Sequence, residues 1–441
     1  MSARRLLPSL VAALLTALIA VPAEASPGDS LWTKTYDGPA SGRDTPSGMA
    51  VDPVLHRVYV VGTTTASTGT TGTFTDIVTI AYDGYTGDTI WARRYDGPVH
   101  GSDLAIAIVY DPFSGGVTVT GGSESSAGTG QVDAVTIAYA ADGSRRWVRR
   151  VTNPATDFPT DLTVIDGSTY VLVHGTLGRL IAYDSTGTRL WSRDAITAET
   201  LAGLTALESI GGYLLIVGRL YDADGHSKMY TLAYKTDGSF VWTKTFAGGS
   251  MQAASTDAAV GSTTLYVTGV YGDALSDIAT IAYDPHNGTR LWRRSITRGA
   301  NRPSGGPFVA VSPDGASIAL ATSVRVGLVD HFLTRRYLSD GSVDWTARED
   351  EIDESGQPTD VAVGAGGNVY VTGSGTNSGA TPGSITLAYP ASGPPTAFQA
   401  AIANADVQDA GFRVAVDPSG YPVFVASRVG LDIRVDSYAT G

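Results

Sequence analysis

The side chains in this sequence that could do chemistry are mostly carboxylates at recurring positions. Three aspartates stand eight residues before an aspartate in a turn, namely Asp44, Asp103 and Asp409. Four others stand six residues before a recurring tyrosine, namely Asp76, Asp133, Asp277 and Asp432. Such carboxylates could collect Ca²⁺, whereas an aspartate beside a turn also accepts backbone N–H bonds and fixes a loop. Because a scaffold needs repetition and a site needs asymmetry, we favour the structural role.

Two acidic segments depart from this recurrence. The first places five acids in six positions, namely Glu349, Asp350, Glu351, Asp353 and Glu354. Calcium or a cationic partner would suit this run, although charge runs usually face water. The second, Asp-Ala-Asp-Gly at 222–225, begins like a calcium loop but lacks its third acid and its terminal glutamate. We therefore predict no cofactor, and Ca²⁺ is the ion that these groups would suit.

The other residue types associated with catalysis form no motif. The six histidines lie far apart in the sequence and show no metal-ligand spacing such as His-x-x-x-His. Neither a Gly-x-Ser-x-Gly elbow nor a phosphate loop ending in Gly-Lys-Ser/Thr occurs. The lack of cysteine excludes disulfides, thiolate zinc sites and a catalytic thiol. The sequence therefore favours binding over catalysis.

The net charge of the chain bears on its partners. The 441 residues carry a formal net charge of -13, which argues against a nucleic-acid partner.

The first residues have the features of an export signal. Arg4 and Arg5 precede an apolar run that ends at Val21, and Ala-Glu-Ala at 23–25 is typical of a signal-peptidase site. This run is too short to span a bilayer, and no later stretch is apolar enough. We predict a signal peptide at 1–25, one domain at 26–441, no membrane span, and a secreted protein, periplasmic if the host has an outer membrane.

An internal repeat occupies the rest of the chain. A tyrosine is followed eight or nine residues later by an aromatic residue, in the pairs Tyr82 and Trp91, Tyr139 and Trp147, Tyr183 and Trp191, Tyr234 and Trp242, Tyr283 and Trp292, Tyr337 and Trp345, and Tyr389 and Phe398. Turn dipeptides such as Asp142-Gly143 separate the β-rich runs, as in a hairpin. Four short strands in about 52 residues, repeated eight times, are typical of propeller blades. We expect the tryptophans to pack between blades.

The two ends of the chain complete the count. Leu31 to Tyr36 matches an outer fourth strand that has no third strand before it, and Ile433 to Tyr438 matches a third strand with no fourth after it. The two halves make one blade, which closes the ring without a covalent bond and covers the free edges. We predict an all-β, eight-bladed propeller of four-stranded blades, with the first blade starting near Gly48 and the eighth near Phe412.

The repeat is similar to two known families. The run from Asp76 to Asp83, followed by Trp91 and by Tyr-Asp-Gly-Pro at 95–98, resembles the bacterial β-propeller repeat family called SBBP. The segment from Ala182 through Gly187 to Trp191 is similar to the tryptophan-docking repeat of quinoprotein propellers. Both resemblances imply a propeller over the mature chain. The second also implies a quinone-dependent dehydrogenase.

Variable loops on a rigid scaffold are where recognition usually lies. The loops that enter the first and third strands of each blade share one face, which we call the top face, and His56 and His286 lie on the opposite face. The top-face candidates for ligand binding are Asp44, His100, Asp103, His226, Arg302 and the acidic run Glu349–Glu354. We predict a monomeric, non-catalytic binding or scaffold module for an extracellular protein or glycan.

Two alternatives remain open at this point. The first is an enzyme, either a quinoprotein-like oxidoreductase or a polysaccharide lyase or hydrolase, with its site in an axial pocket of the top face. The second is a lectin, which would need exposed aromatic side chains such as Phe158, Tyr221 and Tyr271. A close cluster of histidine, arginine and tyrosine side chains at the axis would favour the enzyme.

Overall fold

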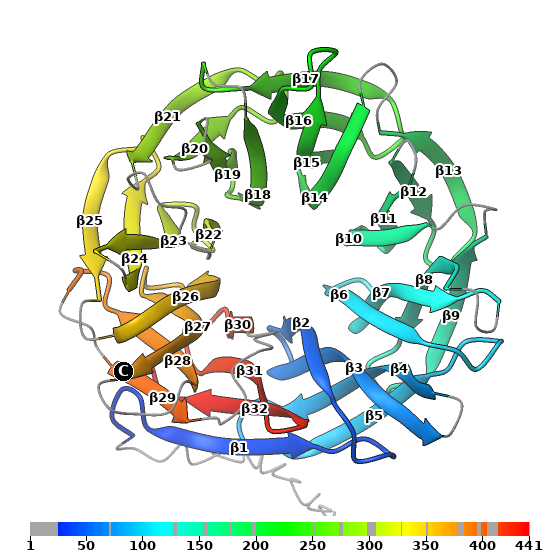
Figure 1. The fold of residues 1–441 in the computed structure, drawn as a ribbon. Helices are drawn as coiled ribbons and strands as arrows, with labels where there is room; N and C mark the ends of the chain where they lie inside the picture. The colour runs from blue at the N-terminus through cyan, green and yellow to red at the C-terminus, as the bar shows by residue number, and fades with distance from the viewer. Residues whose placement is uncertain are drawn as a thin grey trace, which may run out of the picture.

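The computed structural model describes residues 25–440 apart from 70–71, 127–129, 153–156, 176–177, 196–199, 250–251, 273–276, 298–305, 328, 350–351, 378–382, 395–397 and 404–412. The predicted signal peptide therefore lies outside the described residues, save for Ala25. Thirty-two strands form eight four-stranded antiparallel sheets, arranged as blades around an axis (Figure 1). The fold class and blade number predicted from the repeat are confirmed. Within the described ranges, the chain contains no helix with the length and apolar character needed to cross a membrane.

Each blade runs from an inner strand at the axis to an outer strand at the rim (Figure 1). The inner strands are β2 (Thr45–Asp52), β6 (Asp103–Asp111), β10 (Phe158–Ile165), β14 (Thr200–Ile210), β18 (Ala253–Val260), β22 (Phe308–Val311), β26 (Ile352–Val363) and β30 (Arg413–Val416). The second strands are β3 (Arg57–Gly69), β7 (Gly116–Glu124), β11 (Ser168–His174), β15 (Tyr213–Tyr221), β19 (Leu265–Tyr271), β23 (Ser317–Val326), β27 (Val369–Asn377) and β31 (Val423–Val429).

The third strands are β4 (Gly72–Asp83), β8 (Val132–Tyr139), β12 (Arg179–Tyr183), β16 (Ser227–Lys235), β20 (Asp277–Tyr283), β24 (Val329–Leu338), β28 (Gly383–Tyr389) and β32 (Asp432–Tyr438). The outer strands are β5 (Thr89–Tyr95), β9 (Arg145–Val151), β13 (Arg189–Asp194), β17 (Phe240–Phe246), β21 (Arg290–Thr297), β25 (Val343–Arg348), β29 (Phe398–Ala403) and β1 (Ser30–Tyr36). Blades are numbered 1 to 8 from the blade that begins with β2.

The N-terminal strand closes the ring, as predicted. Strand β1 pairs antiparallel with β32, from Tyr36 opposite Ile433 to Ser30 opposite Tyr438, so blade 8 has the order β1-β32-β31-β30. The Thr33 hydroxyl donates a hydrogen bond of 2.6 Å to the Asp436 carboxylate across this pair. Figure 1 shows β1 lying on the rim beside β32. Segments about 400 residues apart in the chain therefore form one sheet.

The tryptophans join neighbouring blades, as predicted. Each indole N–H donates to a backbone carbonyl in the next blade, at 2.8 to 3.3 Å, for Trp32, Trp91, Trp147, Trp191, Trp242, Trp292 and Trp345. Trp32, for example, bonds the Gly84 carbonyl and is 8% exposed. The buried clusters likewise combine residues of two adjacent blades, such as Val61 with Val119. The core is thus divided among the junctions between blades, which explains how so long a chain forms one ring.

A glycine on the next blade lies against each indole face. A Cβ added at Gly143 would lie 2.6 Å from the Trp91 ring, and φ at this glycine is +79°. Equivalent contacts of 2.6 to 2.9 Å occur at Gly87, Gly187, Gly238, Gly288, Gly341 and Gly393. The turn dipeptides seen in the sequence therefore serve two needs, a left-handed backbone and a flat surface for the indole.

Replacing Gly143 tests the docking contact directly. Gly143→Ala is expected to lower the free energy of unfolding by about 2–5 kcal/mol, because the left-handed backbone costs ~1–2 kcal/mol and forced overlap ~1–3 kcal/mol more. Gly115→Ala is the matched control, since φ there is +65° and a Cβ would meet nothing within 4 Å. Urea denaturation followed by tryptophan fluorescence measures both variants. Equal losses would mean that backbone conformation alone, and not the indole contact, selects glycine.

Candidate functional site

A β-bulge recurs in the inner strands and turns side chains toward the axis. Pairing of the first and second strands of a blade skips one residue at Ser47, Ile106, Thr160, Thr205, Thr256 and Thr359. Bulges bend a strand and redirect its side chains. The residue after the bulge is Gly48, Ala107, Asp161, Ala206, Asp257 and Asp360 in these six blades. These two positions supply most of the residues that line the cavity described next.

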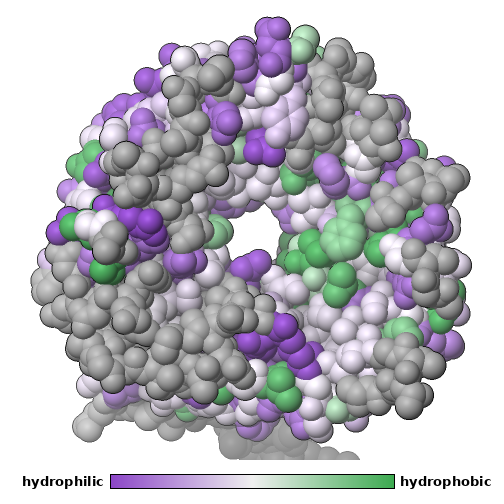
Figure 2. All heavy atoms as spheres, viewed as in Figure 1, coloured by the Kyte–Doolittle hydropathy of each residue, from purple (hydrophilic) through white to green (hydrophobic). Residues whose placement is uncertain are grey.

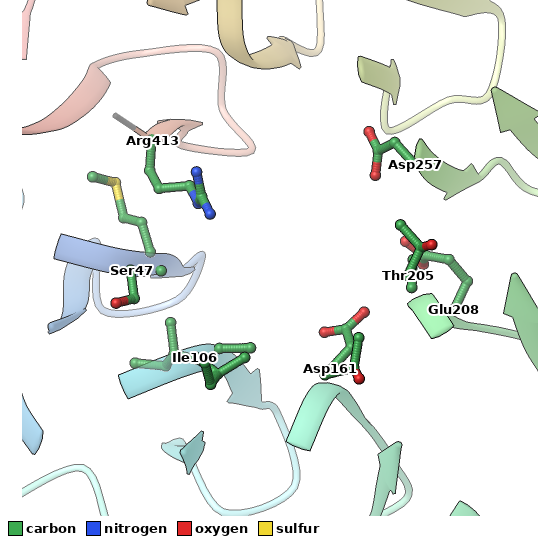
Figure 3. Close-up of a pocket in the computed structure, with 13 residues that line it drawn as sticks. Ser47, Ile106, Asp161, Thr205, Glu208, Asp257 and Arg413 are labelled. Atoms are coloured by element: carbon green, nitrogen blue, oxygen red, sulfur yellow. The ribbon is translucent and has the colours of Figure 1, made fainter. Parts of the chain in front are cut away.

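A cavity of about 290 Å³ lies at this level of the axis. Its lining comes from six inner strands and comprises Ser47, Gly48, Met49, Ile106, Ala107, Ile108, Thr160, Asp161, Thr205, Ala206, Glu208, Asp257 and Arg413. Figure 2 shows that the centre of the face is open. In Figure 3 the carboxylates of β10, β14 and β18 point into the cavity from one side, and Arg413 reaches in from another. Strands β2 and β6 contribute the apolar wall.

Three of the axial aspartates hold neighbouring blades together. The Asp161 carboxylate accepts hydrogen bonds of 2.8 Å from the backbone N–H groups of Leu162 and of Leu207 in the next blade. Asp257 accepts one of 2.8 Å from the N–H of Val309. Asp360 repeats the pattern with the N–H groups of its own strand and of the next inner strand. These aspartates therefore have a structural role whatever else they do.

Glu208 has no counterpart in the other blades. It pairs with Leu215 in β14, and the residues at the same register of the other inner strands are Ala50, Val109, Thr163, Ala259, Ala310, Ala362 and Ala415. None of the described residues donates a hydrogen bond to its carboxylate, which points into the cavity (Figure 3). A charged residue therefore stands, in one blade only, where the other seven blades carry a small uncharged residue.

Burial and mutual repulsion disfavour the ionised forms of these acids. Burial raises the pKa of Asp161 to about 6 and that of Asp257 to about 7. Burial, together with the charges of Asp161 and Asp257, raises the pKa of Glu208 well above its ordinary value. Burial also raises the pKa of Asp360, and the Arg413 guanidinium opposes that shift. The shifts bring the titration of these carboxyl groups closer to neutral pH than that of an exposed carboxyl group.

These shifts predict a stability that falls as pH rises. A carboxyl whose pKa is higher in the folded than in the unfolded chain binds more protons when folded, so its contribution is lost between about pH 4 and pH 7. Asp257→Asn is expected to raise the free energy of unfolding at pH 8 by on the order of 1–2 kcal/mol, because water in the channel screens the repulsion in part. At pH 5 we expect little change in the free energy of unfolding. The asparagine oxygen can still accept from the Val309 N–H.

Thermal unfolding at pH 5 and pH 8 measures this difference. Asp88→Asn is the control, because the Asp88 side chain is 78% exposed on an outer turn. An Asp257→Asn variant that is destabilised equally at both pH values would show that the carboxylate is stabilising in its ionised form.

Two of the predicted site residues are structural. The buried Asp44 carboxylate accepts hydrogen bonds from the N–H groups of Gly38, at 2.6 Å, and Thr65, at 2.9 Å. The buried Asp103 accepts from Gly97 at 2.6 Å in the equivalent loop. Both fix the connection between two blades, which is the role favoured for repeated aspartates.

The other predicted residues lie on separate connections of the top face. His100, on the loop before β6, is 80% exposed and bonds Asp96 at 2.7 Å. His226 lies between β15 and β16, and Glu349 lies between β25 and β26, where its carboxylate accepts from the Tyr389 hydroxyl at 2.8 Å. The six histidines lie in or beside six different blades and do not converge.

Part of the acidic run is not a loop. Arg302, Asp350 and Glu351 lie outside the described residues, while Asp353 and Glu354 belong to strand β26, in which Glu354 is opposite Thr376. The expectation that the whole run is a loop is corrected here, because backbone pairing with β27 extends the inner strand of blade 7 outward. Phe158, Tyr221 and Tyr271, the residues considered for a lectin, are half-buried.

Three clusters in the described chain bring carboxylate or imidazole atoms within 4.8 Å of one another, namely Asp37, Asp44 and Asp432; Asp76, Asp96 and Asp103; and Asp222, Asp224 and His226. Cations of the protein already lie beside two of them. The Arg94 guanidinium is 2.8 Å from Asp76, and the Lys228 ammonium is 3.2 Å from Asp222. No three of the axial carboxylates in the described chain come together in this way.

Sequence reasoning missed the axial residues, although a signal exists. The dipeptide Thr-Asp occurs within the inner strands of blades 3, 5 and 7, at 160–161, 256–257 and 359–360. Glu208 occupies a position at which the other repeats carry a small residue. This difference becomes visible only when the inner strands are aligned with their bulges taken into account. The sequence-based prediction favoured the charged residues of the top-face loops, which are more conspicuous.

Comparisons with known proteins agree with the fold. The model of a family described as outer membrane protein assembly factor BamB matches residues 75–346, more than half of the chain. No curated protein matches the sequence. Among solved structures, Sqt1 from Saccharomyces cerevisiae is 11% identical over 94% of this chain and 100% of that chain, with a TM-score of 0.58.

Two further structures are similar. Sqt1 from Chaetomium thermophilum, bound to the N-terminus of the ribosomal protein L10, is 12% identical over 94% of this chain and 100% of that chain, with a TM-score of 0.54. The quinohemoprotein alcohol dehydrogenase ADHIIG from Pseudomonas putida HK5 is 14% identical over 94% and 76%, with a TM-score of 0.53. These identities show a shared fold alone.

The quinone cofactor implied by the quinoprotein resemblance does not fit the axial cavity. Pyrroloquinoline quinone carries three carboxylates, and the cavity presents Asp161, Glu208 and Asp257 against the single guanidinium of Arg413. Like charges disfavour binding. At about 290 Å³ the cavity is also at the lower limit of small-molecule pockets, which run from ~300 to ~1,000 Å³.

Proposed function

Because the chain belongs to the family of the outer membrane protein assembly factor BamB, we propose that it is an exported, non-catalytic propeller that binds a partner on its top face. The partner is an extracellular or periplasmic protein, with a glycan as the second choice. The chain acts as a monomer, without nucleic acid and without a cofactor. Export rests on the signal sequence predicted at 1–25.

The observation that carries this proposal is the contrast between the two kinds of polar residue on the ring. The carboxylates of Asp44, Asp103 and Asp161 accept hydrogen bonds from backbone N–H groups of their own or a neighbouring blade, so they stabilise the scaffold. Glu208 departs from the repeat at a cavity on the axis. A rigid frame with one asymmetric feature is what a binding module needs.

An enzyme is the second candidate, and the raised pKa values favour it. Asp257, whose pKa burial raises to about 7, could act as a general acid or base beside Glu208. A lyase or hydrolase acting on a polysaccharide would use such groups. A quinone-dependent oxidoreductase is not supported, because the cavity is acidic and small.

Site-directed photocrosslinking separates the two faces of the ring. A photoreactive amino acid replaces His100 or His226 on the top face, and His56 or His286 on the opposite face, in the full chain produced by its own host. We expect adducts to a discrete partner from the top-face positions and none from the other two. Adducts confined to His56 and His286 would contradict the proposal.

A second measurement separates binding from catalysis. Secreted polysaccharides of the host are incubated with the wild-type chain and with Asp257→Asn, and reducing ends and unsaturated products are followed by NMR. We expect no product from either protein. Product formation that is lost in Asp257→Asn would establish the enzyme instead.

A further inference from the structure

Glu208 is the residue on the axis for which the scaffold gives no reason. Five of the other seven blades carry alanine at its register, so the ring does not need a polar group there. Its carboxylate lies in the cavity and receives no hydrogen bond from the described residues. Glu208 is half-buried, and holding its charge beside those of Asp161 and Asp257 costs free energy. A group that the chain keeps at such a cost is matched to a ligand with the opposite charge.

The rest of the cavity wall defines the form of that ligand. Asp161 and Asp257 flank Glu208 on the adjacent inner strands, whereas Ile106 faces the cavity from β6 (Figure 3). Met49 and Ile108 also belong to the lining, and they pack as well against the buried clusters between blades. The wall thus combines an acidic side with an apolar side. A cation on an alkyl stem satisfies both, because the stem covers apolar surface while the head meets the carboxylates. A volume of about 290 Å³ suits one such side chain and little more.

Arg413 indicates that the cation belongs to a peptide. Its guanidinium reaches into the same cavity from β30 (Figure 3). A free polyamine would bring only positive charge to this group. A peptide brings carbonyl oxygens beside its own cation, and a guanidinium donates well to such oxygens.

We propose that the axial cavity binds the side chain of an arginine or lysine presented by an extended segment of the partner protein, with Glu208 and Asp257 as counter-ions and Ile106 in the apolar wall. This inference deepens the proposed binding function and rests on it. Arginine is the better fit, because its planar guanidinium can contact two carboxylates at once and is weakly hydrated.

Proton linkage makes the affinity of the cavity for a cation depend on pH. The charged groups lining the cavity are Asp161 on β10, Glu208 on β14, Asp257 on β18 and Arg413 on β30. Asp360 on β26 is not part of the lining, but its charge acts on Asp257 and is opposed by Arg413. Burial raises the pKa of each of these acids, and repulsion from neighbouring carboxylates adds to the shift for Glu208 and Asp257. A permanent cation favours their ionised forms, so its binding releases protons and strengthens as pH rises from 5 to 8.

Calorimetric titration of the mature chain tests the ligand chemistry. The probes are N-acetyl-arginine amide, its neutral analogue N-acetyl-citrulline amide, and spermidine, at pH 5 and pH 8. We expect the arginine probe to bind at least tenfold more tightly than the citrulline probe at pH 8, and several-fold more weakly at pH 5. Spermidine is expected to bind more weakly than the arginine probe. Tighter binding of spermidine would overturn the assignment to a peptide.

Two variants locate the binding, and one controls for general charge. Glu208→Gln and Asp257→Asn are each expected to weaken the arginine probe at least tenfold at pH 8. Asp88→Asn removes an equal charge from the rim and is expected to leave the affinity unchanged. Arg413→Met is expected to strengthen the binding of spermidine, because it removes the repelling cation.

The outcomes distinguish this inference from the function on which it rests. Equal affinities for the arginine and citrulline probes, or an unchanged affinity in Glu208→Gln, would overturn the axial cation site. So would the absence of binding at 10 mM probe. Top-face crosslinks that persist in Glu208→Gln under any of these results would leave the proposed function standing with its contacts elsewhere on the top face.

Discussion

Deleting residues 431–441 is expected to cause the largest loss of stability of any change considered. The deletion removes β32, so β1 loses its partner in the sheet and β31 gains an open edge. Exposed edges of this kind promote aggregation. With no cysteine in the chain, no disulfide ties the ring shut. We expect the truncated chain to aggregate on expression, or to melt ~10 °C or more below the intact mature chain.

Circular dichroism during heating measures this loss. A chain shortened only by Thr440 and Gly441, which follow the last strand, is the control and is expected to remain folded. Equal melting temperatures for the intact chain and the long deletion would mean that pairing of β1 with β32 does not hold the ring closed.

Replacing Trp32 is expected to have the second-largest effect. Trp32 is 8% exposed, stacks beside Tyr82 of blade 1 with ring centroids 6.1 Å apart, and donates its indole N–H to the Gly84 carbonyl at 2.8 Å. It therefore joins the N-terminal strand of blade 8 to blade 1. Trp32→Ala leaves a cavity at the closing junction and is expected to cost ~3–5 kcal/mol.

A conservative variant separates packing from hydrogen bonding. Trp32→Phe keeps most of the aromatic surface and leaves the Gly84 carbonyl without its donor, so we expect a loss of ~1–2 kcal/mol. Chemical denaturation of the three proteins gives the comparison. Similar losses for Trp32→Ala and Trp32→Phe would show that the hydrogen bond, and not the buried ring, dominates the contact.

The fold could be predicted from the sequence because the same local rules repeat. Seven of the eight blades carry a tyrosine, a turn with glycine and an aromatic residue at a spacing of eight or nine residues, and the structure confirms the reasons for the glycine and the tryptophan. Gly143 lies against Trp91, and the indole bonds the next blade. The unmatched strands at the two ends predicted ring closure, since a strand with unpaired edges needs a partner.

The site could not be predicted in the same way, because its position depends on irregularities. The bulge at Thr205 and the register of β14 decide that Glu208 reaches the axis, and neither can be read from periodicity. The charged loops of the top face were more conspicuous in the sequence. Asp44 and Asp103 turned out to be capped by backbone N–H groups, as a structural role requires.

The family resemblance stands partly confirmed. The match over residues 75–346 and the docking geometry of the tryptophans support a propeller of the quinoprotein type. The similarity to the SBBP repeat family stays a prediction.

Hydrogen–deuterium exchange of the mature chain with and without saturating N-acetyl-arginine amide tests the central claim, that a rigid closed ring binds its ligand in the axial cavity. The account predicts slower exchange in peptides from the inner strands β10, β14 and β18, which carry Asp161, Glu208 and Asp257, and no change in the outer strands or in the turns containing His56 and His286. Protection confined to the outer strands or to those two turns would contradict it.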